Sequence, residues 1–178
     1  HLDWWEGSQE SLLNFFNKHL KLDKKLDSKD SKKEKKIWNI SLNKWDELDD
    51  NFHPEFCFGL KSNGSANVDI EDGSLTINSG GSGWFTIVTD PWRPTPSDGG
   101  HLGPNPGKFN RNAIDKRLDV GVFQTKLFEE DQSFKGVPTL EIIVKSDQPS
   151  FDICLALSHV EENDERVNQF STGFLRVK

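Results

Sequence analysis

Three residue types are scarce or absent in this sequence of 178 residues, which has two cysteines, no methionine and no tyrosine. Cys57 and Cys154 each lie in an apolar, strand-like run, which favours two buried, reduced thiols over a disulfide. Reduced thiols are typical of the cytoplasm, and there is no signal peptide, so we expect a cytoplasmic protein. No apolar run approaches the roughly 18 residues of a membrane-spanning helix, so no membrane partner is expected.

A positive net charge is also lacking, because the formal charge is −7. Nucleic acids and anionic membranes are bound by positively charged surfaces, so neither is an expected partner. What the sequence does contain is 13 Phe, 6 Trp, 14 Gly and 8 Pro, which predict an aromatic core and many turns. This composition favours a mainly β protein, which at this length needs neither a metal nor a disulfide for stability.

Motifs for catalysis and metal binding are almost absent. There is no G-x-S-x-G nucleophile elbow, and the histidines show no HxH or HExxH spacing, so no zinc site, other metal or cofactor is expected. Paired acids lie in turn-like stretches, where solvated loops explain them better than a glycosidase pair. A calcium site formed by Asp69, Glu71 and Asp72 is a minor alternative.

The chain divides into a helix, a charged linker and a β domain. Residues 1–22 contain an amphipathic helix, predicted from Ser8 to Leu22, with Ser8 as its N-cap. Residues 23–36 form a linker, since they lie in the stretch from Lys21 to Lys36, KLDKKLDSKDSKKEKK, which interleaves lysines with acids and has almost no apolar residues. Residues 37–178 form the β domain.

Within the β domain, apolar residues recur with a period of two. About eight strands separated by Gly, Asn, Asp and Pro turns predict an antiparallel sandwich of jelly-roll type. The clearest strand is FDICLALSHV, in which four large apolar residues alternate with smaller or polar ones. The predicted strands cover residues 37–42, 55–60, 74–78, 84–88, 120–125, 140–145, 151–160 and 170–177.

The most informative segment is the loop from Thr89 to Pro104, TDPWRPTPSDGGHLGP. Its four prolines fix φ and bias the preceding residues toward extended geometry, so the loop is expected to be irregular but stiff. Loops of this length in a compact domain are usually functional or disordered. The nearby stretch DKRLDVGVF predicts a charged strand entry, in which Asp119 has Lys116 and Arg117 as alternative partners.

Five separated segments carry a family resemblance. In chain order they are KIWNISLNKWDEL, FCFGLKSNGS, TDPWRPTPSDGG, DKRLDVGVFQTKLFEEDQSFKGVPTLEIIVKSDQPSFDICLALSHV and STGFLRVK. Together they resemble the C-terminal domain of the CocE/NonD serine hydrolases, a group that includes X-Pro dipeptidyl-peptidases, cocaine esterase, α-amino-acid ester hydrolases and glutaryl acylases. The resemblance covers nearly all of residues 37–178, and several motifs occur in the right order.

The ends of the chain are similar to this family only in part. FFNKHLK resembles the helix that closes the preceding α/β-hydrolase part. His1 is then a candidate for the triad histidine, although the family's GPW is missing and the alternative is that a fragment simply begins there. After STGFLRVK the family has further strands that are absent here. The resemblance therefore implies unpaired strand edges and a homo-oligomer as a further partner.

The resemblance implies a jelly-roll, galactose-binding-like domain that packs on its own α/β-hydrolase domain and shapes the substrate pocket. The nucleophile and its acid are not in this chain, so the chain alone is not expected to be an enzyme, whereas its parent is expected to be a serine hydrolase acting as an esterase or aminopeptidase. The residues expected at the pocket or domain interface are Trp92, Pro96, Ser97, Gly99, Gly100, His101 and Leu102.

Other interpretations remain open. The prolines of the loop can simply bridge two sheets, and for Trp92 itself a core position is favoured. A carbohydrate-binding module of the same fold would need exposed aromatic rings, for which Trp45, Trp84 and Trp92 are the candidates. A purely structural, dimerising β-sandwich is the remaining alternative.

Overall fold

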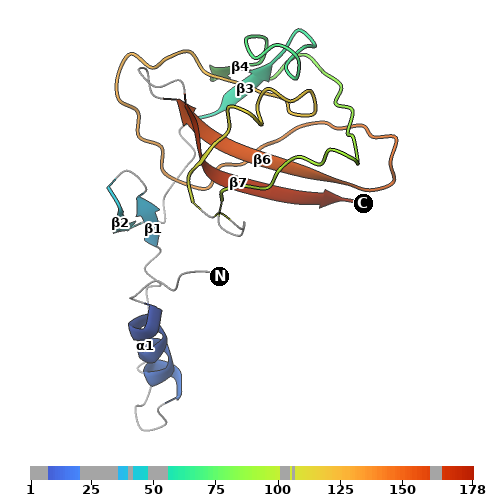
Figure 1. Ribbon diagram of the computed structural model, residues 1–178. Coiled ribbons are helices and arrows are strands. Elements are labelled where there is room, and N and C mark those ends of the chain that lie inside the picture. The colour runs from blue at the N-terminus through green and yellow to red at the C-terminus, as the bar shows by residue number, and fades with distance from the viewer. Residues whose placement is uncertain are drawn as a thin grey trace. The chain divides into compact units, whose positions relative to one another are not determined.

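The computed structural model describes two compact units, His1–His53 and Pro54–Lys178 (Figure 1). Among the described residues, the first unit has one helix and one β-hairpin, and the second has five strands in two sheets. The described residues are 8–20, 36–39, 42–47, 56–100, 105, 107–160 and 166–178.

The N-terminal helix α1 spans Ser8–Leu20. Its start agrees with the prediction from the capping residue Ser8, and Glu10 lies in the first turn, where an acid interacts favourably with the helix dipole. The last two predicted helical residues lie outside the described residues. The apolar side chains of this helix remain exposed, namely Leu12, Leu13, Phe15, Phe16 and Leu20.

The hairpin of the first unit joins β1 (Lys36–Asn39) and β2 (Lys44–Glu47). The chain turns at Asn43, whose φ of 50° is the left-handed value that asparagine tolerates. Trp38 lies directly opposite Trp45, and the two rings meet edge to face with centroids 5.2 Å apart. Such a cross-strand aromatic pair stabilises a short hairpin. Of the strand predicted over residues 37–42, the structure describes 37–39 as strand and Leu42 as part of the turn, and residues 40 and 41 lie outside the described residues.

The smaller sheet of the second unit pairs β3 (Phe58–Lys61) with β4 (Ser74–Ile77) in antiparallel fashion. Extended segments continue it on both sides. The amide of Ser82 donates to the carbonyl of Leu60 at 2.8 Å, and the amide of Leu75 donates to the carbonyl of Gln124 at 2.8 Å. The neighbouring chain segments thus satisfy backbone groups at both edges of this sheet.

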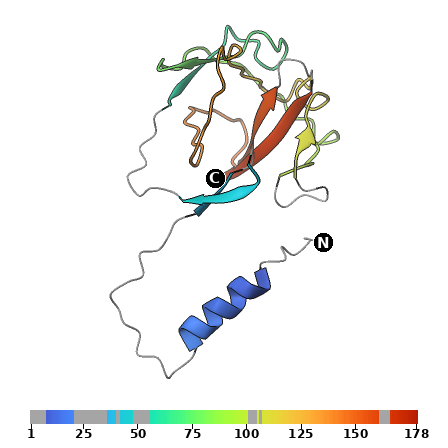
Figure 2. The same ribbon diagram turned by 90° about the vertical axis from the view of Figure 1, so that its left-hand side faces the viewer.

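The larger sheet has the order β5-β7-β6 (Figure 2). Its strands are β5 (Phe109–Asn110), β6 (Phe151–Val160) and β7 (Val167–Val177). All pairings are antiparallel, and the register between β6 and β7 shifts at Leu157 and Ser158, where β7 carries an extra residue.

The prediction of a mainly β protein with one N-terminal helix is confirmed. The described strands form three small antiparallel sheets, and the jelly-roll arrangement stays a prediction. The strands predicted at 84–88, 120–125 and 140–145 are wrong, since these segments form single bridges at most. A period of two favours an extended chain, but a strand also needs a partner along its whole length.

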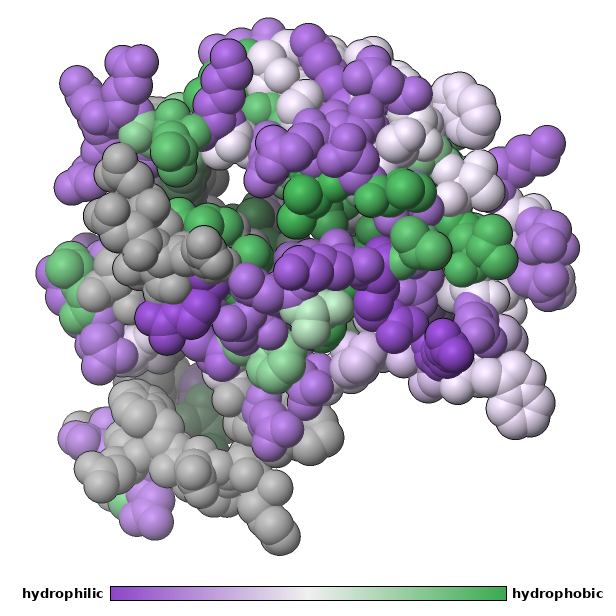
Figure 3. Space-filling view, turned by 45° about the horizontal axis from the view of Figure 1, so that its top comes forward, coloured by the Kyte–Doolittle hydropathy of each residue, from purple (hydrophilic) through white to green (hydrophobic). Residues whose placement is uncertain are grey.

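Burial in this fold is limited. Among the described residues, the only buried apolar side chains are those of Ala66 and Ile114. Many apolar side chains lie at the surface between polar ones (Figure 3). The expectation of buried thiols is wrong, because Cys57 and Cys154 are both exposed, although both are free as predicted. No helix among the described residues is long and apolar enough to cross a membrane.

Candidate functional site

The described part of the Thr89–Pro104 loop begins with a β-turn at Asp90. The carboxylate of Asp90 accepts a hydrogen bond from the amide of Trp92 at 2.9 Å, and its carbonyl accepts one from the amide of Arg93 at 3.0 Å. Aspartate at the first turn position and proline at the second are the residues that such a turn prefers. The sequence Asp-Pro-Trp-Arg therefore fixes the backbone at Trp92.

This turn presents the indole of Trp92 to solvent. Trp92 is 93% exposed, so the interpretation that it fills the core is wrong. Trp92 is exposed because of its place in the turn. Both hydrogen bonds of the turn bind backbone amides, and among the described residues no apolar side chain covers the ring. Two more large apolar side chains just before the turn, Trp84 and Val88, are also exposed, at 77% and 79%.

A charged pair anchors the middle of the loop. The guanidinium of Arg117 binds the carboxylate of Asp119 in a bidentate arrangement, with both N–O distances at 2.7 Å. The same guanidinium donates to the carbonyl of Arg93, and the hydroxyl of Thr95 donates to Asp119 at 3.1 Å. Bidentate pairs of this kind are stronger and more directional than single contacts. Asp119 therefore pairs with Arg117, and together they hold two loop residues.

The electrostatics of this anchor follow from its geometry. The hydrogen bond from Arg117 lowers the pKa of Asp119, with a further contribution from Thr95, while burial acts in the opposite direction. The hydrogen bond to Asp119 in turn raises the pKa of Arg117. The Asp119 side chain is only 9% exposed, so water screens the pair weakly. Both groups are ionised at neutral pH.

A glycine turn forms the far end of the described loop. Gly99 and Gly100 have φ values of 75° and 73°, which only glycine adopts readily. The amide of Gly99 donates to the carbonyl of Asn105 at 2.9 Å, and Gly100 and Gly107 exchange two backbone hydrogen bonds. A side chain on Gly100 would meet the hydroxyl oxygen of Thr172 at 2.7 Å. The turn therefore lies directly on strand β7.

The predicted site residues are only partly described by the structure. Trp92, Pro96, Ser97, Gly99 and Gly100 occupy one continuous loop, with Gly99 buried and Trp92, Pro96 and Ser97 exposed. The remaining three, His1, His101 and Leu102, lie outside the described residues.

Two anchoring residues were not among the predicted site residues. Arg117 and Asp119 lie two positions apart in a charged stretch. This short spacing was the only feature of the sequence that indicated an ion pair between them. Nothing in the sequence pointed to Gln169, whose side chain also reaches this loop.

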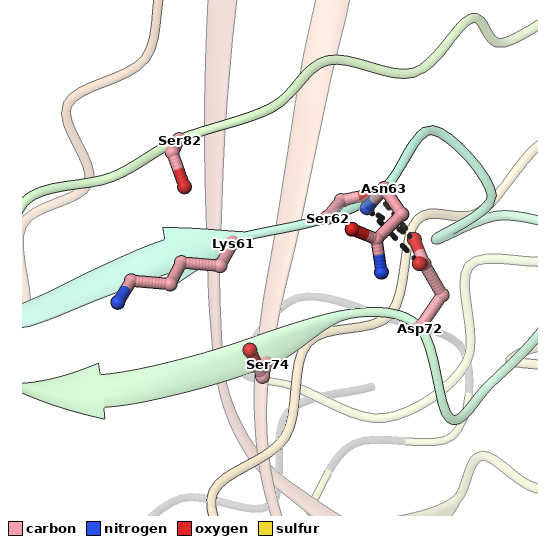
Figure 4. Close-up of a pocket in the computed structure, with 6 residues that line it drawn as sticks. All are labelled: Lys61, Ser62, Asn63, Asp72, Ser74 and Ser82. Carbon is pink, nitrogen blue, oxygen red and sulfur yellow. Dashed lines mark hydrogen bonds between the residues drawn. The ribbon is translucent and has the colours of Figure 1, made fainter.

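A separate polar pocket of about 270 Å³ lies beside β3 (Figure 4). Its carboxylate, that of Asp72, accepts hydrogen bonds from the hydroxyl of Ser62 and from the amides of Asn63 and Ser65. The hydrogen bond from Ser62 is the largest cause of the lowered pKa of Asp72. Lys61 points away from this carboxylate. The pocket is lined by Lys61, Ser62, Asn63, Asp72, Ser74 and Ser82.

The carboxylates around this pocket have structural roles. Asp72 holds the 62–65 turn, and the carboxylate of Asp69 accepts the amide of Glu71 at 3.0 Å. Within the part of the chain that the structure describes, no three His, Cys, Asp or Glu side chains come close enough to hold a metal ion. The calcium alternative therefore has no support from the geometry of Asp69, Glu71 and Asp72.

Comparison with known proteins gives one match. The family model described as the X-Pro dipeptidyl-peptidase C-terminal non-catalytic domain matches residues 9–178. No curated protein and no solved structure matches the chain significantly. The family match spans almost the whole chain, including the loop and the residues that hold it, Arg117, Asp119 and Gln169.

Proposed function

This chain belongs to the family of X-Pro dipeptidyl-peptidase C-terminal non-catalytic domains, and we propose that it packs on an α/β-hydrolase domain of the same polypeptide and shapes its substrate pocket. The parent protein would be a serine hydrolase of the dipeptidyl-peptidase or acyl-esterase type. Catalysis by a Ser-His-Asp triad requires a nucleophile within hydrogen-bond reach of a base. In this proposal the nucleophile and the acid of the triad come from the catalytic domain.

The single observation that carries the proposal is the exposure of Trp92 on an anchored turn. An indole that is 93% exposed leaves a large apolar surface in water. Tryptophans of this kind are enriched among the residues that dominate binding energy at protein interfaces. The Asp90 turn and the Arg117 anchor fix the backbone beforehand, so little conformational entropy is lost on docking. Trp92 is the proposed contact with the catalytic domain.

The loop continues from Trp92 toward the glycine turn, and this continuation is the proposed pocket wall. Pro96 and Ser97 are exposed, and Gly99 and Gly100 bring the backbone to a tight turn. His101 and Leu102 follow directly in sequence and would add a polar and an apolar side chain to the wall. His1 is retained only as a proposed triad histidine.

The test is steady-state kinetics of the full-length enzyme carrying Trp92→Ala. We expect the ratio of kcat/KM between X-Pro p-nitroanilides with small and large X residues to change, while hydrolysis itself continues. Trp84→Ala is the matched control, because it removes the same exposed side chain from outside the loop. A ratio that stays the same in Trp92→Ala and in a His101→Ala, Leu102→Ala double variant would refute the pocket role.

A carbohydrate-binding function is the second candidate, and the exposure of Trp84 and Trp92 favours it. Exposed indoles can stack on sugar rings, and both rings here are accessible from solvent. Glycan-array binding that is lost in both Trp84→Ala and Trp92→Ala would support this function. Absence of binding to any glycan would remove it.

A further inference from the structure

Gln169 is the most deeply buried polar residue among those described. It is 1% exposed and lies on β7, between Phe109 of β5 and Ser158 of β6. A buried amide is unfavourable unless its donors and acceptors find partners. The position of Gln169 at the centre of the β5-β7-β6 sheet therefore requires an explanation from its hydrogen bonds.

The two ends of this amide bind different parts of the chain. Its oxygen accepts a hydrogen bond from Arg111 Nη1 at 2.7 Å, and its nitrogen donates to the carbonyl of Asp98 at 3.1 Å. Arg111 is itself held by Asp115, with Nε and Oδ1 2.9 Å apart and both side chains largely buried. A row of hydrogen bonds thus runs from Asp115 to the loop.

The polarity of this row leaves the amide a single orientation. Arginine carries only donors, so Gln169 must turn its oxygen toward Arg111. Its NH₂ group then faces the carbonyl of Asp98, which is an acceptor. The orientation of the amide is therefore set by Arg111, and the position of Asp98 is set by the amide.

The adjoining glycine turn has no room to move toward β7. A Cβ atom on Gly99 would lie 2.6 Å from both Gln169 Nε2 and Phe109 Cβ, and one on Gly100 would lie 2.7 Å from Thr172 Oγ1. These distances are well inside van der Waals contact. Asp98, Gly99 and Gly100 are thus seated on the sheet at three successive positions.

We propose that Gln169 is a positioning residue for the loop segment 96–100 and, through it, sets the substrate preference of the parent enzyme. The second part rests on the proposed function, in which this loop forms part of the pocket wall. Gln169 touches no substrate itself. It acts by donating a hydrogen bond to the Asp98 carbonyl. Without this bond, the backbone of the glycine turn would move more.

The conservative variant Gln169→Glu separates this role from simple packing. It keeps the size of the side chain and the acceptor for Arg111, but it loses the donor to Asp98. Gln148→Glu makes the same chemical change at an exposed position and serves as the control. Both variants are measured in the full-length enzyme, by hydrogen exchange of peptides covering residues 96–100 and by kcat and KM on X-Pro p-nitroanilides.

In Gln169→Glu we expect exchange in residues 96–100 to rise roughly tenfold, because the partly buried carbonyl of Asp98 loses its donor. The kcat/KM ratio between small and large X residues is expected to change by about tenfold through KM, with kcat nearly unchanged. Arg111→Lys weakens the hydrogen bond to the side-chain oxygen of Gln169 and is expected to change both quantities in the same direction. It replaces Gln169→Glu in the experiment if that variant does not fold. Gln148→Glu is expected to change neither quantity.

Three results separate this inference from the proposed function. Unchanged exchange in residues 96–100 overturns the positioning role. Faster exchange with an unchanged substrate ratio, in an enzyme whose ratio does respond to Trp92→Ala, overturns the link between Gln169 and preference and leaves the proposed function standing. A ratio that responds neither to Gln169→Glu, nor to Trp92→Ala, nor to the His101→Ala, Leu102→Ala double variant overturns both.

Discussion

Replacing Gly99 with alanine tests whether the glycine turn is as tightly seated on the sheet as its contacts indicate. The φ of Gly99 is 75°, and an alanine held in this left-handed region is destabilised by roughly 1–2 kcal/mol. The new methyl carbon would also lie 2.6 Å from Gln169 Nε2 and from Phe109 Cβ. Overpacking of this kind adds about 1–3 kcal/mol, so the turn should lose roughly 2–5 kcal/mol of local stability.

Gly107→Ala is the matched control for the backbone contribution. Gly107 has a φ of 99°, but a Cβ atom there would meet nothing within 4 Å. It should therefore lose only the roughly 1–2 kcal/mol that left-handed backbone geometry demands of alanine. Gly173→Ala on β7 also finds open space and has ordinary backbone geometry, so it should be nearly neutral.

The assay is hydrogen exchange of the Gly100 amide, which donates to the carbonyl of Gly107 at 3.1 Å. The steric difference of about 1–3 kcal/mol between Gly99→Ala and Gly107→Ala corresponds to exchange roughly 5-fold to 150-fold faster in Gly99→Ala. Equal exchange rates in these two variants would refute the argument, because they would mean that Gln169 and Phe109 yield to the methyl group without loss.

Two further predictions concern ionisable groups. The hydrogen bond from Arg117 lowers the pKa of Asp119 below its ordinary value of 3.8. The contribution of this pair to folding stability should therefore be complete above pH 3.8, and it should be lost as the pH falls through the lower pKa of the folded state. Carboxyl-carbon NMR should show the midpoint rising in Arg117→Gln, and an unmoved midpoint would contradict the pairing. Burial raises the pKa of the Cys154 thiol, and the negative charge of Asp152 raises it further. Asp152→Asn should therefore speed the alkylation of Cys154 by iodoacetamide, measured relative to that of Cys57 in the same sample. An unchanged ratio of the two alkylation rates would exclude a charge effect of Asp152.

Local sequence patterns predicted the elements whose signals are complete within one segment. The strand Phe151–Val160 was predicted with the bounds that the structure has, because its alternation is unbroken and turn-forming residues surround it. Helix α1 begins at its predicted cap, Ser8. For both ends of β6 and for the start of α1, the periodicity and the flanking residues carry enough information, whereas the predicted end of the helix at Leu22 lies outside the described residues.

Burial was not predictable in the same way. The alternation in β6 predicted one buried face, yet Leu155 and Leu157 are 39% and 42% exposed. A period of two shows which side chains share a face, but burial depends on whether another layer covers that face. The same distinction applies to Cys57 and Cys154, whose apolar neighbours suggested a core that the described residues do not form around them.

The candidate site was predictable as a segment but not as a set of contacts. Prolines and glycines identified the loop, while the partner of Asp119 was undecided between Lys116 and Arg117 until the bidentate geometry selected the arginine. Gln169 lies 71 residues from the Asp98 carbonyl that it binds and 58 residues from Arg111. Contacts over such separations leave no mark in a single sequence, since neither residue type nor spacing distinguishes Gln169 from an ordinary strand residue.

Two anchors hold the loop on either side of its prolines while Trp92 stays exposed. The Arg117 anchor holds the backbone next to Trp92, and the Gln169 anchor holds the other end of the loop on β7. The Asp90 turn and the Arg117 hydrogen bond hold the backbone at Trp92 and Arg93, while the indole itself lies in solvent. A partner that binds Trp92 therefore also fixes where the glycine turn lies, because the prolines between them transmit position with little flexing. Docking of the catalytic domain and shaping of its pocket would then be two effects of one stiff segment.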